Sequence, residues 1–155
     1  MNNQRCQHRE PDILWYYKEN MKIVSACLAG RKCRWDGKSA ANPEIVALVK
    51  KGLALAVCPE ELGGLPTPRP RAEQRGKRFF TEHGLDITWQ LTLGAKEALR
   101  IAKLNKCKEA ILKSKSPSCG AGKVYDGTFS GKLVEGDGVF AKMLKEGDIK
   151  VVSQD

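Results

Sequence analysis

Six cysteines are the residues of this sequence with the most chemistry to offer: Cys6, Cys27, Cys33, Cys58, Cys107 and Cys119. No two of them form a C-x-x-C pair, which argues against a zinc ribbon and a thioredoxin-like motif. A disulfide framework is typical of small secreted chains, and this sequence does not open with a basic and then apolar secretory segment. The cysteines therefore point to metal binding, redox chemistry or catalysis.

Three of these cysteines follow predicted strands. Short runs of strand length occur at residues 22–26, 53–57 and 109–113. Cys27 and Cys58 come directly after the first two runs, and Cys119 comes a few residues after the third. Parallel strands end at the same edge of a sheet, so the three thiols are expected to converge there and to suit a soft metal. Cys33 is a possible fourth ligand, and buried free cysteines are the alternative.

Helices alternate with these strands along the chain. Asn42 is a helix cap with Pro43 at the first helical position, and Gly52 ends that helix. Further helices are predicted over residues 88–105 and 139–145, and a fourth strand over residues 149–153. This alternation predicts a three-layer α/β fold, a mostly parallel sheet of about four strands with helices on both faces. Residues 59–86 are predicted as a long loop that forms a lid or a wall of a site, and residues 114–137 as a second, Gly- and Ser-rich loop region.

Polar side chains beside the cysteines could take part in a reaction. Glu60 follows a candidate ligand closely, where a carboxylate can act as a general base, whereas Glu61 is expected to be a solvated charge. Arg69 lies in a proline-stiffened loop, where its planar fork suits a carboxylate, a phosphate or a polar heterocycle. A rigid surface loop without that role is the alternative. Ser116 and Ser118 place hydroxyl groups beside the third candidate ligand.

The composition is that of one globular domain, with 155 residues, 41% hydrophobic and 29% charged. It excludes a disordered tail, a coiled coil and a collagen-like chain. No stretch approaches the ~18 apolar residues of a membrane span, so a cytoplasmic protein is expected. The Gly-rich stretch 127–131 lacks the Lys-Ser/Thr of a P-loop, which excludes that class of nucleotide triphosphatase. The net charge of +9 is expected to attract anions such as phosphates or RNA. The alternative is that it is an ordinary property of a soluble protein's surface.

The first twenty residues differ from the rest of the chain. They are mostly polar, carry the aromatic cluster Trp15, Tyr16 and Tyr17, and contribute none of the excess positive charge. Residues 1–20 are predicted either as an N-terminal extension, with Met21 as a natural start, or as a helix that docks its aromatic residues. Residues 21–155 are expected to form a single domain.

Several long motifs, in order, resemble the thiouracil desulfidase family. They are the runs VSACLAG (24–30), CRWDG (33–37), CPEELGGLPTPR (58–69), SPSCG (116–120) and YDGTFSG (125–131). The resemblance covers the chain from about Met21 to its end. Arg71 and Phe140 depart from the family pattern, where Pro and Thr are frequent, and both could touch the substrate pocket.

The resemblance implies a [4Fe-4S] cluster with one open iron site, bound by Cys27, Cys58 and Cys119. It makes Glu60 and Ser116 the acid–base pair. Cys33 matches a family cysteine that is not expected to be a ligand. Together with Arg69 and Ser118, Cys33 is a candidate for contact with the substrate or for support of the cluster.

The implied reaction is the non-redox conversion of a thiolated pyrimidine to its oxo base with release of hydrogen sulfide. The substrate would be thiouracil or its nucleoside or nucleotide, and tRNA is the less favoured partner; no membrane partner is expected. One alternative is a non-catalytic metal-binding module with a basic, RNA-binding surface. Another is a redox protein that pairs Cys27 with Cys33.

Overall fold

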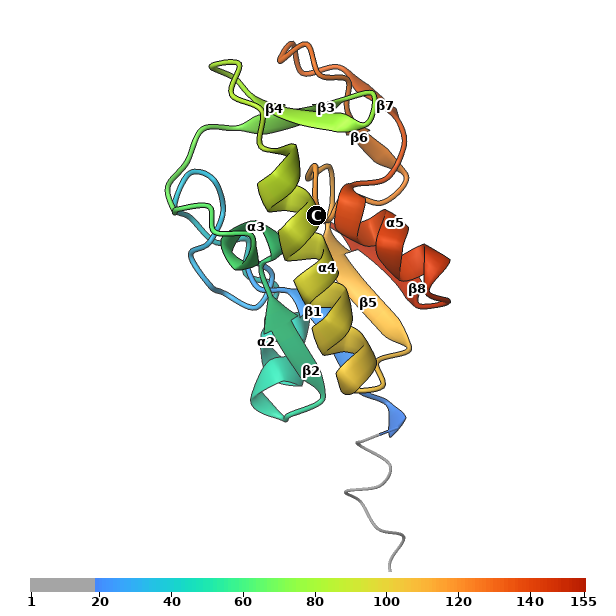
Figure 1. Cartoon of the computed structure of the whole chain (residues 1–155). Helices are drawn as coiled ribbons and strands as arrows, with labels where there is room; N and C mark the ends of the chain where they lie inside the picture. The colour runs from blue at the N-terminus through green and yellow to red at the C-terminus, as the bar shows by residue number, and fades with distance from the viewer. Residues whose placement is uncertain (1–18) are drawn as a thin grey trace, which may run out of the picture.

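A four-stranded parallel sheet forms the centre of the computed structural model, which describes residues 19–155 (Figure 1). The strands lie in the order β2-β1-β5-β8. Their bounds are Lys22–Ser25 for β1, Ala54–Val57 for β2, Glu109–Lys113 for β5 and Lys150–Gln154 for β8. Every neighbouring pair is parallel, which confirms the predicted sheet.

Helices cover both faces of this sheet and complete three layers. Consecutive strand residues point to opposite faces, so Ile23 packs into one core cluster and Val24 into the other. The cluster of Ile23 contains Ala98 of α4 (Thr88–Leu104) and Leu144 of α5 (Val139–Glu146). The cluster of Val24 contains Ile45 of α2 (Pro43–Lys50). The predicted three-layer α/β fold is therefore confirmed.

The strand order creates a switch point at the carboxyl ends of the strands. From β1 the chain moves outward to β2, then crosses back over β1 to β5 and continues to β8. The connections that follow β1 and β5 consequently leave the sheet in opposite directions, which opens a crevice between them. Cys27 follows β1 and Cys119 follows β5, so two of the predicted ligands lie at this crevice.

The two stretches predicted as long loops contain regular structure, which corrects that prediction. The first holds α3 (Pro59–Leu62) and the antiparallel strands β3 (Ala72–Arg75) and β4 (Arg78–Thr81). The second holds the antiparallel pair β6 (Lys123–Tyr125) and β7 (Leu133–Glu135). The strands are only three or four residues long and carry many charges, so their local sequence gives little indication of them. Both hairpins lie above the carboxyl ends of the sheet (Figure 1), and we call them the cap.

The predicted N-terminal extension, with its three aromatic residues, lies outside the described residues except for Glu19 and Asn20. Over residues 19–155, no helix combines the length and the apolar character that a membrane crossing requires.

Candidate metal centre and active site

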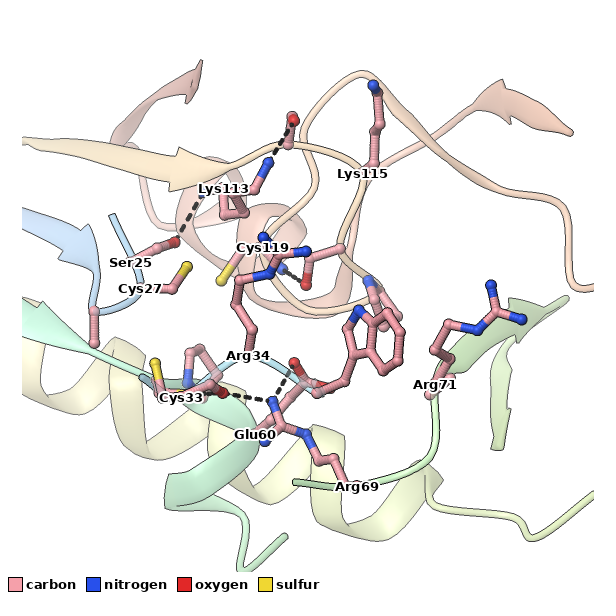
Figure 2. A pocket seen from close by; sticks show the side chains of 18 of the residues that line it. Ser25, Cys27, Cys33, Arg34, Glu60, Arg69, Arg71, Lys113, Lys115 and Cys119 are labelled. Carbon is pink, nitrogen blue, oxygen red and sulfur yellow. Dashed lines mark hydrogen bonds and ion pairs between the residues drawn. The ribbon is translucent and has the colours of Figure 1, made fainter. Parts of the chain in front are cut away.

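A cavity of about 410 Å³ lies between the sheet and the cap, and four cysteines line it. They are Cys27, Cys33, Cys58 and Cys119, each of them at most 9% exposed. Cys27, Cys33 and Cys119 are labelled in the close view of Figure 2. The prediction that the strand-end cysteines converge is thus supported by their placement. Cys107 lies in the hydrophobic core and does not line this cavity, and Cys6 lies outside the described residues.

Short turns at the ends of the strands fix three of these cysteines. Cys27 follows the end of β1, and its carbonyl accepts a hydrogen bond from the backbone N–H of Ala40, 3.0 Å away. Cys58 is the N-cap of α3, so the helix begins directly after this candidate ligand. Cys119 lies in a turn whose backbone N–H groups point at Ser116. The backbone of each of these cysteines is therefore held by a turn or by the start of a helix.

The thiols are close enough to change one another's protonation. A hydrogen bond from Cys33 lowers the pKa of Cys27, and the same contact raises the pKa of Cys33 to about 11. Contact with Cys33, followed by burial, raises the pKa of Cys58, and burial raises that of Cys119. Four adjacent thiols cannot all be ionised without a cation, so a metal centre would replace their protons.

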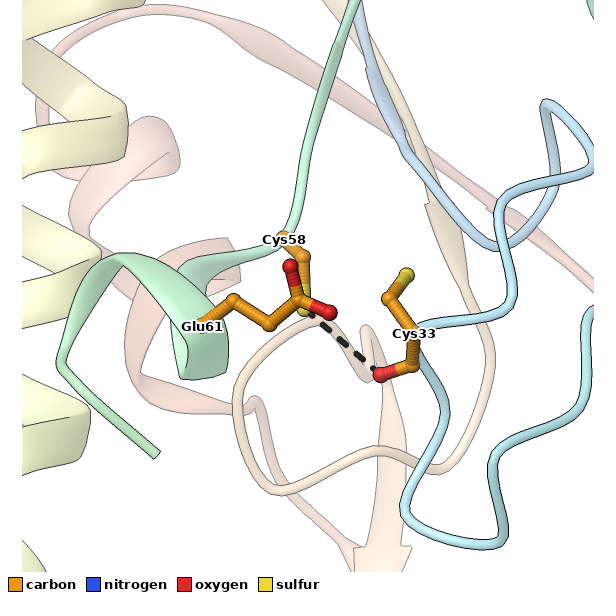
Figure 3. Close-up of side chains that lie close together, drawn as sticks. All are labelled: Cys33, Cys58 and Glu61. Atoms are coloured by element: carbon orange, nitrogen blue, oxygen red, sulfur yellow. Dashed lines mark hydrogen bonds between the residues drawn. The ribbon is translucent and has the colours of Figure 1, made fainter. Parts of the chain in front are cut away.

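A close group of possible ligand atoms joins Cys33, Cys58 and Glu61 (Figure 3). Their sulfur and oxygen atoms all lie within 4.8 Å of one another. Glu61 already accepts hydrogen bonds from Arg31 at 2.7 Å and from Thr67 at 3.0 Å, and it does not line the cavity. The Glu61 carboxylate is thus hydrogen bonded within the protein, whereas the sequence predicted a solvated charge.

Glu60 lines the cavity beside the cysteines and is paired with Arg69. Nη2 of Arg69 lies 3.2 Å from Oε2 of Glu60 and 3.0 Å from the carbonyl oxygen of Cys33. Only 4% of the Arg69 side chain is exposed, against 17% for Glu60. The structure therefore brings the predicted acid–base residue and the predicted arginine together in one contact.

Ser116 has a structural role that the sequence did not indicate. Its Oγ accepts hydrogen bonds from the backbone N–H groups of Ser118 and Cys119, each at 3.1 Å. Ser116 also lines the cavity, in agreement with its predicted place beside the ligand. Ser118 is fully buried behind this turn and does not line the cavity, and its hydroxyl has no partner among the described residues.

The lining of the cavity also includes residues that the sequence did not single out. Arg34, Trp35 and Glu73 line it, although the first two belong to a recognised motif and follow Cys33 directly. The guanidinium of Arg71 lies over the Trp35 ring, 5.7 Å from its centroid. The position of Arg34 and Trp35 directly after Cys33 was the sequence feature that could have indicated their place in the cavity lining.

The donor set fits a sulfur-ligated metal centre. All five described cysteines are free, and four of them converge on one cavity without any histidine in its lining. Thiolate ligands select soft metals and iron–sulfur clusters over hard, oxygen-ligated cations. The cavity is also larger than a four-coordinate zinc ion requires, which leaves space for a second molecule.

Comparisons with known proteins agree with this chemistry. The family model described as 2-thiouracil desulfurase matches residues 23–155. The uncharacterized protein YbbK of Bacillus subtilis (strain 168) is 42% identical over 144 residues, which cover 86% of this chain and 95% of YbbK. A solved structure of a [4Fe-4S]-dependent thiouracil desulfidase, TudS, superposes with a TM-score of 0.84 at 44% identity. That match covers 88% of this chain and 91% of TudS. These matches confirm the resemblance seen in the motifs, and the chain belongs to the 2-thiouracil desulfurase family of enzymes.

Proposed function

We propose that this protein is a non-redox desulfidase that converts a thiolated pyrimidine to its oxo base and releases hydrogen sulfide. One observation carries the proposal: three strand-end cysteines, Glu60 and Ser116 line the same cavity in a chain of this family. The substrate class comprises thiouracil and its nucleoside and nucleotide. The free cysteines of residues 19–155, five in number, suit the reducing conditions of the cytoplasm, where we place the reaction.

Cys27, Cys58 and Cys119 are the proposed ligands of a [4Fe-4S] cluster. With three protein ligands, the cluster would leave one iron open as a soft Lewis acid for a thiocarbonyl sulfur. The described cavity supports this role because its lining is formed by both the cysteines and polar groups. Cys33 is proposed to support the neighbouring cysteines, since it hydrogen bonds to both Cys27 and Cys58.

Glu60 is the proposed general base. One of its oxygens is held by Arg69, and the other has no hydrogen-bond partner among the described residues. That second oxygen can take a proton from the water that attacks the ring carbon. Ser116 lies in the same cavity and can orient the ring or pass a proton. The exchange of sulfur for the oxygen of water needs no electron donor or acceptor.

Anaerobic reconstitution with iron and sulfide tests this proposal. We expect a brown protein with broad visible absorption that converts 2-thiouracil to uracil, whereas the metal-free protein is inactive. In ¹⁸O-labelled water the uracil should carry the label, because the new oxygen comes from water. Unlabelled uracil would exclude the hydrolytic reaction. A colourless zinc protein would support a metal-binding module, and a metal-free protein with a reversible disulfide would support the redox alternative.

A further inference from the structure

Arg69 is a buried cation in the wall of the proposed active site, and its side chain contacts the proposed general base Glu60. We infer that Arg69 is the positioning residue of the reaction: it holds one oxygen of Glu60 and the backbone of Cys33, and so directs the other oxygen of Glu60 into the cavity. This inference rests on the proposed function, in which Glu60 is the general base.

The guanidinium of Arg69 is fixed at both of its terminal nitrogens. Figure 2 shows the contacts of one of them, to Glu60 and to the Cys33 carbonyl. Nη1 donates to Oγ1 of Thr67 at 2.9 Å and to the carbonyl oxygen of Pro66 at 3.3 Å. Nη2 donates to Glu60 and to the carbonyl of Cys33. A planar fork with this many acceptors has one orientation, so the nitrogen that meets Glu60 is itself fixed.

The contact is asymmetric at Glu60. Arg69 engages Oε2, and no described residue hydrogen bonds to Oε1. Because the side chain keeps 17% exposure and lines the cavity, Oε1 is the oxygen left to meet a bound water. Orientation of a catalytic group before the reaction lowers the barrier, since the freedom to rotate is already lost.

Arg69 also links two loops of the cavity through hydrogen bonds. The backbone N–H of Arg69 donates to the carbonyl of Trp35 at 2.8 Å, and its side chain reaches the carbonyl of Cys33. The thiol of Cys58 points at the Cys33 carbonyl as well, at 3.9 Å. Arg69 therefore sets Glu60 relative to the cysteines, which a lysine with one ammonium group could do only in part.

Direct contact with the substrate is the competing role for Arg69. Both terminal nitrogens are already bound to protein acceptors, and only Nε lacks a partner among the described residues. The two roles differ in their kinetics. A positioning residue affects kcat through Glu60, whereas a substrate contact affects KM and does not depend on Glu60.

A double-mutant cycle in reconstituted protein tests the inference. With 2-thiouracil as substrate, Arg69→Met should lower kcat on the order of 10²-fold and Arg69→Lys on the order of 10-fold, with iron content and KM near those of the parent. In the Glu60→Gln background, each Arg69 substitution should change kcat less than about threefold, because residues that act as a unit are not additive. A crystal structure of Arg69→Met should show the Glu60 carboxylate displaced.

Three results would overturn the inference. The first is an unchanged kcat with a raised KM in Arg69→Met. The second is a decrease in kcat that is as large in the Glu60→Gln background as in the parent. The third is a Glu60 carboxylate that keeps its place in the crystal structure of Arg69→Met. If Arg69→Met does not fold, Arg69→Lys keeps the buried charge and carries the same test, and full kcat in Arg69→Lys would contradict the need for a fork. Arg100→Met is the matched control, since Arg100 pairs with Glu97 on the exposed face of α4. A parent protein without any turnover would instead refute the proposed function.

Discussion

The backbones of Gly63 and Gly94 meet without side chains between them. A Cβ atom on Gly63 would lie 2.0 Å from the carbonyl oxygen of Gln90, and one on Gly94 would lie 1.8 Å from that of Pro59. Such distances allow only glycine at both positions, because backbone atoms cannot move away cheaply. This contact docks α3, which carries Glu60 and follows its N-cap Cys58, directly on the long helix α4.

Substitution of Gly94 by alanine should therefore disturb the site from a distance. Alanine favours the helix locally, but its methyl group would push α3 away from α4 and cost on the order of 1–3 kcal/mol of unfolding free energy. Urea unfolding of the metal-free protein measures this loss. Lys96→Ala, on the exposed face of the same helix, is the control and should change stability by less than about 0.5 kcal/mol. Equal stabilities would show that the two helices can separate freely.

The ligand assignment predicts a sharp division among the cysteines. Replacement of Cys27, Cys58 or Cys119 by alanine should abolish cluster assembly, since only two of the three proposed ligands remain and Cys33, the other thiol of the lining, is not expected to replace the third. Cys33→Ala should reduce iron binding only in part. Iron and sulfide per chain, after anaerobic reconstitution, are the measurements.

Cys107→Ala is the matched control, because Cys107 is an equally buried free thiol that does not line the cavity. It should retain a full cluster and full turnover. A full cluster in Cys27→Ala, together with its loss in Cys33→Ala, would replace Cys27 by Cys33 in the ligand set. The close grouping of Cys33 with Cys58 and Glu61 makes this the most informative comparison.

Glu60→Gln should keep the cluster and lower turnover on the order of 10²–10⁴-fold. Glutamine has nearly the same shape but cannot accept a proton, and this range is typical for the loss of one acid–base residue. Single-turnover kinetics with 2-thiouracil measure the effect, and visible absorption reports the cluster. Glu97→Gln, an exposed residue on α4, is the control. Loss of colour in Glu60→Gln would assign the residue to cluster support instead.

The sheet and the convergence of the cysteines were predictable because they depend on local and topological rules. The apolar run around Ile23 and Val24 indicates a buried strand, and parallel strands place Cys27 and Cys58 at one edge. The cap was not predictable in the same way. Strand β3 has the sequence AEQR, and its position depends on Glu73, whose buried carboxylate accepts the N–H groups of Gly127 and Phe129. Such contacts join residues more than fifty positions apart.

The role of Arg69 shows the same limit within the site. The sequence indicates a rigid loop and a fork that could bind an anion, and the observed anion is Glu60 of the same chain. The contact to the Cys33 carbonyl spans 36 residues and requires both cavity loops to be folded. The residue could therefore be singled out from the sequence, but its partners could not.

Ser116→Ala should affect both assembly and turnover. It removes the hydroxyl from the cavity and also the acceptor of two backbone N–H groups in the turn that carries Cys119. We expect iron content to fall in part and turnover per iron to fall at least tenfold. Ser153→Ala, an exposed position on β8, should change neither quantity. Full iron content with reduced turnover would leave Ser116 with the chemical role alone.

The positive rim of the cavity predicts a preference for a substrate that carries phosphate. Arg34, Arg71, Lys113 and Lys115 all line the cavity, whereas Lys123 does not. Phosphate on the sugar of a thiolated nucleotide would be attracted by these cations both through contact and through their long-range field. The monophosphate should therefore have a higher kcat/KM than free thiouracil.

Ionic strength separates this attraction from a general surface charge. At 0.1 M salt, exposed charges more than ~10 Å apart are largely screened, so the advantage of the monophosphate should shrink as salt rises. Arg71→Gln and Lys115→Gln should reduce the advantage at low salt and leave the kcat/KM of free thiouracil nearly unchanged. Lys123→Gln removes the same charge outside the cavity and is the matched control. Equal kcat/KM values for the two substrates at every salt concentration would contradict this prediction. The free base would then be the better candidate for the substrate, and the positive charge at the rim would have no role in recognition.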